Sequence, residues 1–274
     1  TVPIGAGLSS SAAFEVATAR FVLAMTGHEM DPMELAKLAR RAENEFVGVP
    51  CGLMDQFISV FGQADSAVLL NCRTLEHRAV PLELGECVLV LSDTMVKHEL
   101  GSTEYAHRQE ECATGLTVAR QVLSREIDQL GQLTIDEFDT VRDQLEPVVR
   151  RRVRHVVTEN RRVLDTVDAL QKQDLATVGQ LLLASHASLR DDYEVSCPEL
   201  DFMVTAAMNH PGTLGARMVG GGFGGCVLTL IGQDELDSFA SYLKRAYRDQ
   251  TGRETTLIEV EPAPGARAWT TGGA

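Results

Sequence analysis

The sequence predicts an α+β fold in which helices cover an antiparallel sheet, and three observations lead to it. Residues 134–189 show the apolar periodicity of amphipathic helices. Residues 215–260 read as strand, glycine loop, strand, helix and strand, in that order. Cys87–Thr94 is a short apolar run, rich in β-branched residues, that is typical of a buried strand. A block of helices beside such strands is typical of the α+β class.

The size and charge of the chain limit its organisation and its partners. With 274 residues it can form one large domain or two ordinary ones, and we place a boundary near Leu84, which gives domains 1–84 and 85–274. The formal net charge of −14 argues against nucleic acid or an anionic membrane as a partner. The six cysteines are scattered without a C-x-x-C pair, which predicts reduced thiols in a cytoplasmic protein. We expect a monomer.

The stretch Pro3–Ala13 places two glycines and three serines directly before an alanine-rich helix. Gly5 and Gly7 let the backbone approach a ligand closely, and a helix start offers free N–H groups to an anion such as phosphate. A loop that only caps the helix is the alternative. The stretch is not a P-loop, because it has no lysine. It is not a G-x-G-x-x-G loop either, because Ser10 stands where the third glycine belongs.

Two helices are predicted after this loop. Ser11–Met25 is apolar nearly all round, which predicts a buried helix. Asp31 as cap and Pro32 at the first position begin a second helix that runs to about Glu45. Glu43 and Glu45 stand at its C-terminal end, where a carboxylate opposes the helix dipole. They form either a solvated helix end or part of a metal site.

Asp55 stands in an otherwise apolar stretch that reads as a helix with Pro50 in its first turn. Because a buried acid needs a partner or a task, two readings are open. Asp55 is a structural aspartate bonded to backbone, or it faces a reactive hydroxyl as general base or anchor. Beyond it, 67–71 and 80–84 read as strands. Tyr105 lies where a loop meets the next helix, a place suited either to binding a polar ligand or to half-buried packing.

The C-terminal half contains three further signals. Thr134 and Glu137 form a capping box ahead of a helix. The basic run 150–155 lies in a helix that also carries acids, which predicts a solvated face. Five glycines from Gly220 to Gly225 indicate a backbone packed closely against another backbone or a ligand.

Together these stretches resemble the GHMP small-molecule kinases. Pro3–Ala13 is similar to the family's second motif, which wraps the ATP phosphates, and Gly215–Gly225 to its third, a glycine loop that supports the active site. Glu43–Phe57 closely resembles the galactokinase segment around the catalytic aspartate. Ser185–Asp201 resembles a galactokinase run almost residue for residue. The resemblance implies a two-domain GHMP kinase fold, with a first domain like ribosomal protein S5 and a ferredoxin-like second domain.

The resemblance also implies a role for each matching position. The ATP phosphates would contact the loop residues Gly5, Ala6, Gly7, Leu8, Ser9, Ser10 and Ser11. Ser11 and Glu43 would hold Mg²⁺, for which a hydroxyl and a carboxylate are suitable hard ligands. Asp55 would face the C1 hydroxyl of galactose, and Gly52 and Tyr105 would touch the sugar. The implied reaction is the phosphorylation of galactose by Mg·ATP to galactose 1-phosphate.

Galactokinases carry a first motif upstream of the phosphate loop, with an arginine near the catalytic aspartate, that these 274 residues do not contain. We therefore expect a C-terminal fragment, truncated in its N-terminal domain and weakly active or inactive alone. Two alternatives stay open. One is another GHMP kinase, for N-acetylgalactosamine, mevalonate or homoserine, of which Ser185–Asp201 disfavours the last two. The other is a non-catalytic galactose and ATP sensor, which Asp55 and the intact serines disfavour.

Overall fold

The structure, a computed structural model, describes residues 2–3, 6–49, 51–96 and 101–269; for 101–103 it describes the backbone only. The chain divides into two compact units. The first unit combines the residues up to Glu83 with those from Val260, and the second is Leu84–Glu259. Each unit has its own hydrophobic core. Among the described residues, no helix is both long and apolar enough to span a bilayer.

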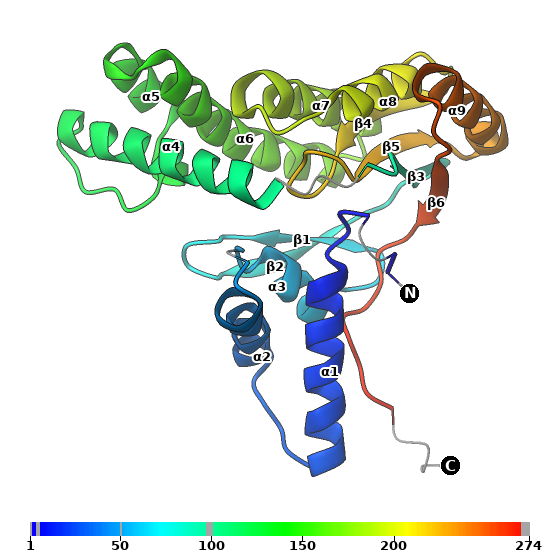
Figure 1. Cartoon of the computed structure of the whole chain (residues 1–274), viewed down its shortest axis with the longest axis horizontal. Helices are drawn as coiled ribbons and strands as arrows, with labels where there is room; N and C mark the ends of the chain where they lie inside the picture. Colours follow the sequence, from blue (N-terminus) through cyan, green and yellow to red (C-terminus); the bar gives the residue numbers. More distant parts are fainter. Residues whose placement is uncertain (1, 4–5, 50, 97–100, 270–274) are drawn as a thin grey trace. The chain divides into compact units, whose positions relative to one another are not determined.

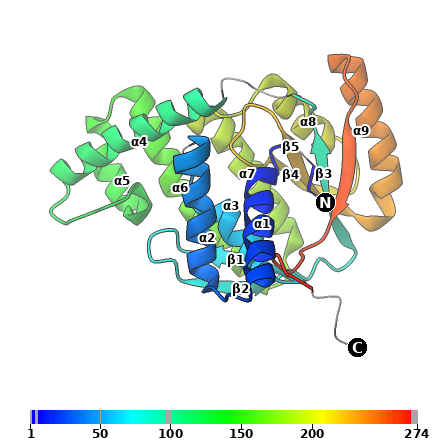
Figure 2. The same cartoon turned by 60° about the horizontal axis from the view of Figure 1, so that its bottom comes forward.

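The first unit places three helices beside a two-stranded antiparallel sheet. Its elements are α1 (Ser10–Thr26), α2 (Pro32–Arg41), the π-helical turn η1 (Ala42–Val47), α3 (Met54–Phe61), β1 (Ser66–Leu70) and β2 (His77–Pro81). Figure 2 shows α1 and α2 side by side, and both pack against α3. Val16, Leu35 and Phe57 form the centre of the core between them. The predicted cap of α2 is confirmed, because the Asp31 carboxylate accepts hydrogen bonds from the first-turn amides.

α1 is buried on one side only, so the prediction of a buried helix is wrong for much of its surface. Ala12 and Val16 are buried, whereas Phe14, Phe21 and Met25 are exposed, Phe14 to 74%. The reason lies in its neighbours, since α2 and α3 together cover only one stripe of α1. A helix that is apolar on every side can be buried all round, but its sequence does not determine how many neighbouring elements pack against it.

The C-terminal segment from Val260 packs in the first unit, although the boundary predicted near Leu84 placed it in the second domain. The Gly265 N–H donates to the Gly62 carbonyl, and the Ala266 N–H donates to the Ser59 carbonyl, both at 2.8 Å. These bonds fasten the segment to the end of α3. A backbone pairing of this kind depends on the folded position of α3, which no local sequence signal records.

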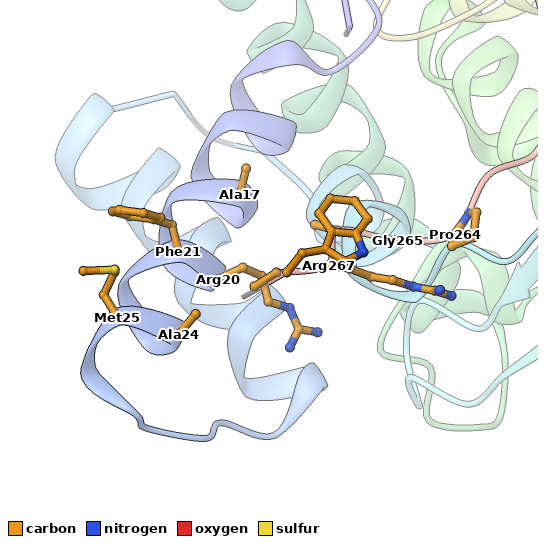
Figure 3. A pocket seen from close by; sticks show the side chains of 11 residues that line it. Ala17, Arg20, Phe21, Ala24, Met25, Pro264, Gly265 and Arg267 are labelled. Carbon is orange, nitrogen blue, oxygen red and sulfur yellow. The ribbon is translucent and has the colours of Figure 1, made fainter. Parts of the chain in front are cut away.

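A cavity of about 860 Å³ lies between α1 and this segment. Figure 3 shows Phe21 and Met25 of α1 on one wall and Pro264 and Arg267 on the other. The cavity follows the C-terminal half of α1, whereas the predicted phosphate-binding residues end in its first turn.

The second unit builds helices on a four-stranded sheet of order β4-β5-β3-β6 (Figure 1). Its strands are β3 (Cys87–Asp93), β4 (Thr213–Met218), β5 (Cys226–Gly232) and β6 (Thr256–Val260). Its main helices are α4 (Gly101–Val122), α5 (Ile135–Val141), α6 (Pro147–Gln171), α7 (Leu175–Ser188), α8 (Pro198–Met208) and α9 (Leu236–Thr251), with a π-helical turn η4 (Leu189–Tyr193). β5 runs antiparallel to both β3 and β4, and α7 and α8 pack on β4. The α+β class is therefore confirmed.

Two local predictions in the second unit have opposite outcomes. The capping box is confirmed, because Thr134 Oγ1 accepts from the Glu137 amide at 3.2 Å and Glu137 Oε2 accepts from the Thr134 amide at 2.9 Å. The solvated face predicted for the basic run 150–155 is wrong for Arg152, which is 1% exposed, and for the buried His155. The physical reason is that α4 and η4 pack on that side of α6.

α7 meets β4 backbone to backbone. A Cβ added to Gly179 of α7 would overlap the Leu214 carbonyl, and a Cβ added to Gly215 would overlap the Gly179 carbonyl. Glycine is required at both positions because only a residue without a side chain allows this approach.

Gly179→Ala should therefore lower the free energy of unfolding of the second unit by about 3 kcal/mol, since the clash forces the helix off the strand. Gly232→Ala is the matched control, because a Cβ there would meet no atom within 4 Å. Urea unfolding of both variants measures the difference. Equal losses would contradict the packing described for α7 and β4.

Candidate active site

The start of α1 is not capped by the side chain that precedes it. Ser9 is its N-cap residue, with φ 56°, and its side chain makes no capping hydrogen bond. The alternative reading, a loop that only caps the helix, therefore fails for the Ser9 side chain, because its left-handed backbone does not direct the hydroxyl to the first-turn amides. A strained non-glycine residue of this kind is often found at functional sites. The first amides of a helix have no partner within it, and together with the helix dipole they favour an anion at such a start.

The other predicted loop residues surround this helix start. Gly5 lies outside the described residues. Gly7 has φ 71°, which favours glycine, and Ala6 is buried. Leu8 and Ser10 are half-buried and Ser11 is exposed, one turn before Glu15 on α1.

Glu43 enters the interior of the first unit through η1, the π-helical turn that continues α2. It is 7% exposed, and its Oε2 is buried without a hydrogen-bond partner among the described residues. The solvated helix end is therefore wrong for Glu43 and right for Glu45, whose side chain is 73% exposed. Such π turns are enriched at functional sites because the widened turn redirects a side chain.

The carboxyl group of Glu43 contacts a second carboxyl group, that of Glu15 on α1. Burial and a hydrogen bond with Glu43 together raise the pKa of Glu15 to about 7, against the opposing hydrogen bond from Gln56. Gln56 Nε2 donates to Glu15 Oε2 at 3.2 Å. The carboxyl groups of Glu15 and Glu43 therefore meet, and Gln56 bonds to one of them.

Asp55 acts on the same thiol group as this pair, that of Cys51. Burial raises the pKa of the Cys51 thiol, and the charges of Glu43, Glu15 and Asp55 raise it further, so the three carboxyl groups act on one sulfur atom. The Asn44 side chain holds Cys51 in place by accepting from its backbone N–H at 2.9 Å. The first unit thus gathers three acids from α1, η1 and α3.

Asp55 itself is half-buried on the first turn of α3, and no described residue donates a hydrogen bond to its carboxylate. The sequence indicates a more enclosed position. The difference arises because the helical period places Gln56, Phe57 and Val60 on the buried face, and Asp55 lies beside that face. The predicted helix start at Pro50 lies outside the described residues, and α3 begins at Met54.

The two predicted sugar contacts lie apart in the chain. Gly52 is exposed, and a Cβ there would meet no atom within 4 Å, so packing does not require this glycine. Tyr105 belongs to the second unit and is half-buried in the second turn of α4. The prediction that it lies where a loop meets a helix is wrong, because α4 begins at Gly101.

Comparison with known proteins supplies the family. Residues 1–63 match the profile described as the GHMP kinases N terminal domain, and residues 166–249 match GHMP kinases C terminal. The galactokinase of Thermotoga neapolitana is 47% identical over 266 residues, which cover 97% of this chain and 73% of that protein. The chain belongs to the galactokinase family of GHMP kinases.

Solved structures agree with this assignment. The crystal structure of Lactococcus lactis galactokinase complexed with galactose matches with a TM-score of 0.92 and 34% identity, over 96% of this chain and 68% of that one. A galactokinase from Roseiflexus sp. is 44% identical over 96% of the chain and 67% of its own length. The mevalonate kinase of L. major, at 18% identity and a TM-score of 0.60, shares the fold alone. As a galactokinase family member, the chain is an ATP-dependent sugar kinase with Mg²⁺ as its metal cofactor.

The three acids Glu15, Glu43 and Asp55, called the acid cluster below, are suitable for binding Mg²⁺. Among the described residues, no three histidine, cysteine or acidic side chains form a ready cage for a metal. Mg²⁺ does not need one, because it binds through one or two carboxylates, substrate phosphates and water. The unpartnered Glu43 Oε2 is an oxygen of the required kind, and the exposed Ser11 hydroxyl lies on α1 about 6 Å of helix rise from Glu15.

Sequence reasoning missed one acid of this cluster, Glu15, and two amide side chains that bond beside it, Asn44 and Gln56. For Glu15 a signal is present, because it is the one acid in the apolar helix Ser10–Thr26. Gln56 follows Asp55 directly and is buried, yet a glutamine beside an apolar run carries no distinctive pattern.

Proposed function

We propose that this chain carries the phosphate-binding and catalytic residues of a galactokinase that transfers the γ-phosphoryl group of ATP to the C1 hydroxyl of galactose. The observation that supports it most is the joint presence, in the first unit, of an uncapped start of α1 and an acid cluster to which the same helix contributes Glu15. An anion site and a cation site that both involve α1 would suit the phosphates of a nucleotide and the metal ion bound to them. Ser9, Ser10 and Ser11 amides bind the phosphates in this proposal.

The proposed reaction needs little covalent chemistry from the protein. The C1 oxygen forms a bond to the γ-phosphorus, the bond to the bridging oxygen of ADP breaks, and the C1 hydroxyl proton passes to Asp55 or to water while Asp55 anchors the oxygen. Glu43 and Ser11 hold Mg²⁺, which when bound neutralises charge on the phosphate oxygens. Gly52 and Tyr105 position the sugar.

The setting proposed for this enzyme follows from its substrates and charge. All six cysteines lie in the described part of the chain and none forms a disulfide there, which together with the use of ATP fits the cytoplasm. With a net charge of −14, we propose a monomer that binds neither nucleic acid nor membranes.

ADP release by the natural protein that contains this sequence tests the proposal, with galactose, N-acetylgalactosamine, mevalonate and homoserine as acceptors. We expect turnover with galactose in the ordinary kinase range of about 1–100 s⁻¹. A preference for N-acetylgalactosamine would assign the other sugar kinase. Tight binding of galactose and ATP without ADP release would overturn catalysis in favour of a sensor.

A further inference from the structure

A buried arginine in the second unit connects helix α4 with the η4 turn. The proposed function assigns this arginine no role. Arg152 of α6 is 1% exposed, and its guanidinium donates three hydrogen bonds of 2.6 Å. The acceptors are Glu111 Oε2 on α4, the Asp192 carbonyl in η4 and Glu194 Oε2 just after η4. The rigid guanidinium fork therefore fixes α4 and the η4 turn relative to α6.

A second arginine also donates hydrogen bonds to the backbone of this turn. Arg108 of α4 donates from Nε to the Tyr193 carbonyl at 2.8 Å and from Nη2 to the Glu194 carbonyl at 3.0 Å. With the bond from Arg152, three successive carbonyls from Asp192 to Glu194 are held by arginines. Glu194 has φ 55°, a left-handed conformation that costs energy in a residue with a Cβ. The two arginines stabilise a backbone shape that the chain does not favour by itself.

The next residue transmits this shape to the glycine loop between β4 and β5. The Val195 carbonyl accepts from the Phe223 N–H at 2.7 Å, and a Cβ on Gly222 would overlap it. On the other side, the Val96 carbonyl accepts from the Gly225 N–H at 3.3 Å. The glycine loop thus lies between two backbone carbonyls, one of which directly follows the arginine-held turn.

The same contacts place Tyr105. It precedes Arg108 by three residues and therefore lies one turn away on the same face of α4. A change in the η4 turn that releases Arg108 would also release this part of α4.

We propose that Arg152 is a positioning residue for the sugar kinase reaction, which sets the place of the glycine loop Gly220–Gly225 and of Tyr105 through the η4 turn. The proposal rests on the proposed function for its kinetic consequence and on the contacts above for its structural one. A purely stabilising role is the weaker account, because a buried ion pair is often no more stable than apolar residues of the same volume. We infer instead that the network holds the backbone of the η4 turn in one conformation.

Arg152→Met tests the proposal, with Arg161→Met as control. Arg161 lies on α6 as well, but its side chain is 62% exposed and pairs with Asp165. In Arg152→Met we expect hydrogen exchange at the Phe223 and Gly225 amides to be at least about 10-fold faster. We also expect kcat/KM for galactose to fall about 10- to 100-fold, mainly through KM for galactose, because displacement of a substrate-positioning group by about 1 Å has effects of this size. KM for ATP should change less than about twofold, since the phosphate loop belongs to the other unit.

The two readouts separate the possible failures. If the unsubstituted protein does not phosphorylate galactose, the proposed function fails, while amide exchange still judges the role of Arg152. Unchanged exchange in Arg152→Met, or an equal change in Arg161→Met, would overturn the positioning role.

A further variant covers the case in which Arg152→Met unfolds because it removes the buried cation between two carboxylates. Arg152→Met combined with Glu111→Gln and Glu194→Gln removes those charges. We expect this variant to fold and still to show the fast exchange at Phe223. Loss of the fold in both variants would assign Arg152 to stability alone and reject the proposal.

Discussion

Asp55→Asn should leave the protein folded and lower kcat for galactose phosphorylation by about 10²–10⁴-fold, the usual contribution of a general base. The substitution keeps the shape of the side chain but removes the charge that accepts the proton or anchors the oxygen. Because Asp55 is half-buried without a described hydrogen-bond donor, no buried partner is left unpaired. The Kd for ATP should stay within about twofold, since the phosphates are assigned to the start of α1.

The measurement pairs ADP release with calorimetric binding of ATP. Asp65→Asn is the matched control, since Asp65 is exposed with φ 54°, a conformation that asparagine tolerates. We expect Asp65→Asn to keep the full kcat. If Asp55→Asn also keeps the full kcat, Asp55 is not the catalytic carboxylate.

Glu43→Gln should lower kcat at a fixed Mg²⁺ concentration by about 100-fold or more. A bound metal ion supplies several kcal/mol of charge stabilisation, and about 1.4 kcal/mol corresponds to each tenfold in rate. Glutamine keeps the volume and one oxygen of Glu43 but not its charge, so activity should recover in part as Mg²⁺ is raised. Titration of kcat against Mg²⁺ measures this shift.

Glu45→Gln is the control for Glu43, two residues away on the same π-helical turn but exposed. We expect its Mg²⁺ dependence to match that of the unsubstituted protein. A parallel loss in both variants, or a rate in Glu43→Gln that no longer depends on Mg²⁺ at all, would remove Glu43 from the metal site.

Several features could be predicted from the sequence because they depend on residues close together in the chain. The Asp31 cap joins positions two and three residues apart, and the Thr134–Glu137 box joins positions three apart. The buried strand Cys87–Asp93 lies where its apolar run places it. The galactokinase resemblance rests likewise on contiguous runs, which is why the sequence alone indicates both family and fold.

Other features could not be predicted, because a helical period orients a side chain about its own axis and says nothing of the neighbour it meets. The acid pair of Glu15 and Glu43 joins α1 to η1, and the raised pKa of Glu15 depends on burial. Arg152 reads as one basic residue among several, yet its partner Glu111 lies 41 positions earlier in the chain.

The family, the α+β class, two helix caps and the short list of candidate acids could be inferred from the sequence, since all of these depend on local runs of residues. The folded structure was needed to show which acids meet, which side of α1 is covered, and which arginine holds the η4 turn. The physical reason is that burial and charge pairing are properties of the space between elements. Their free energies depend on what each side chain faces, and that is set when distant segments pack together.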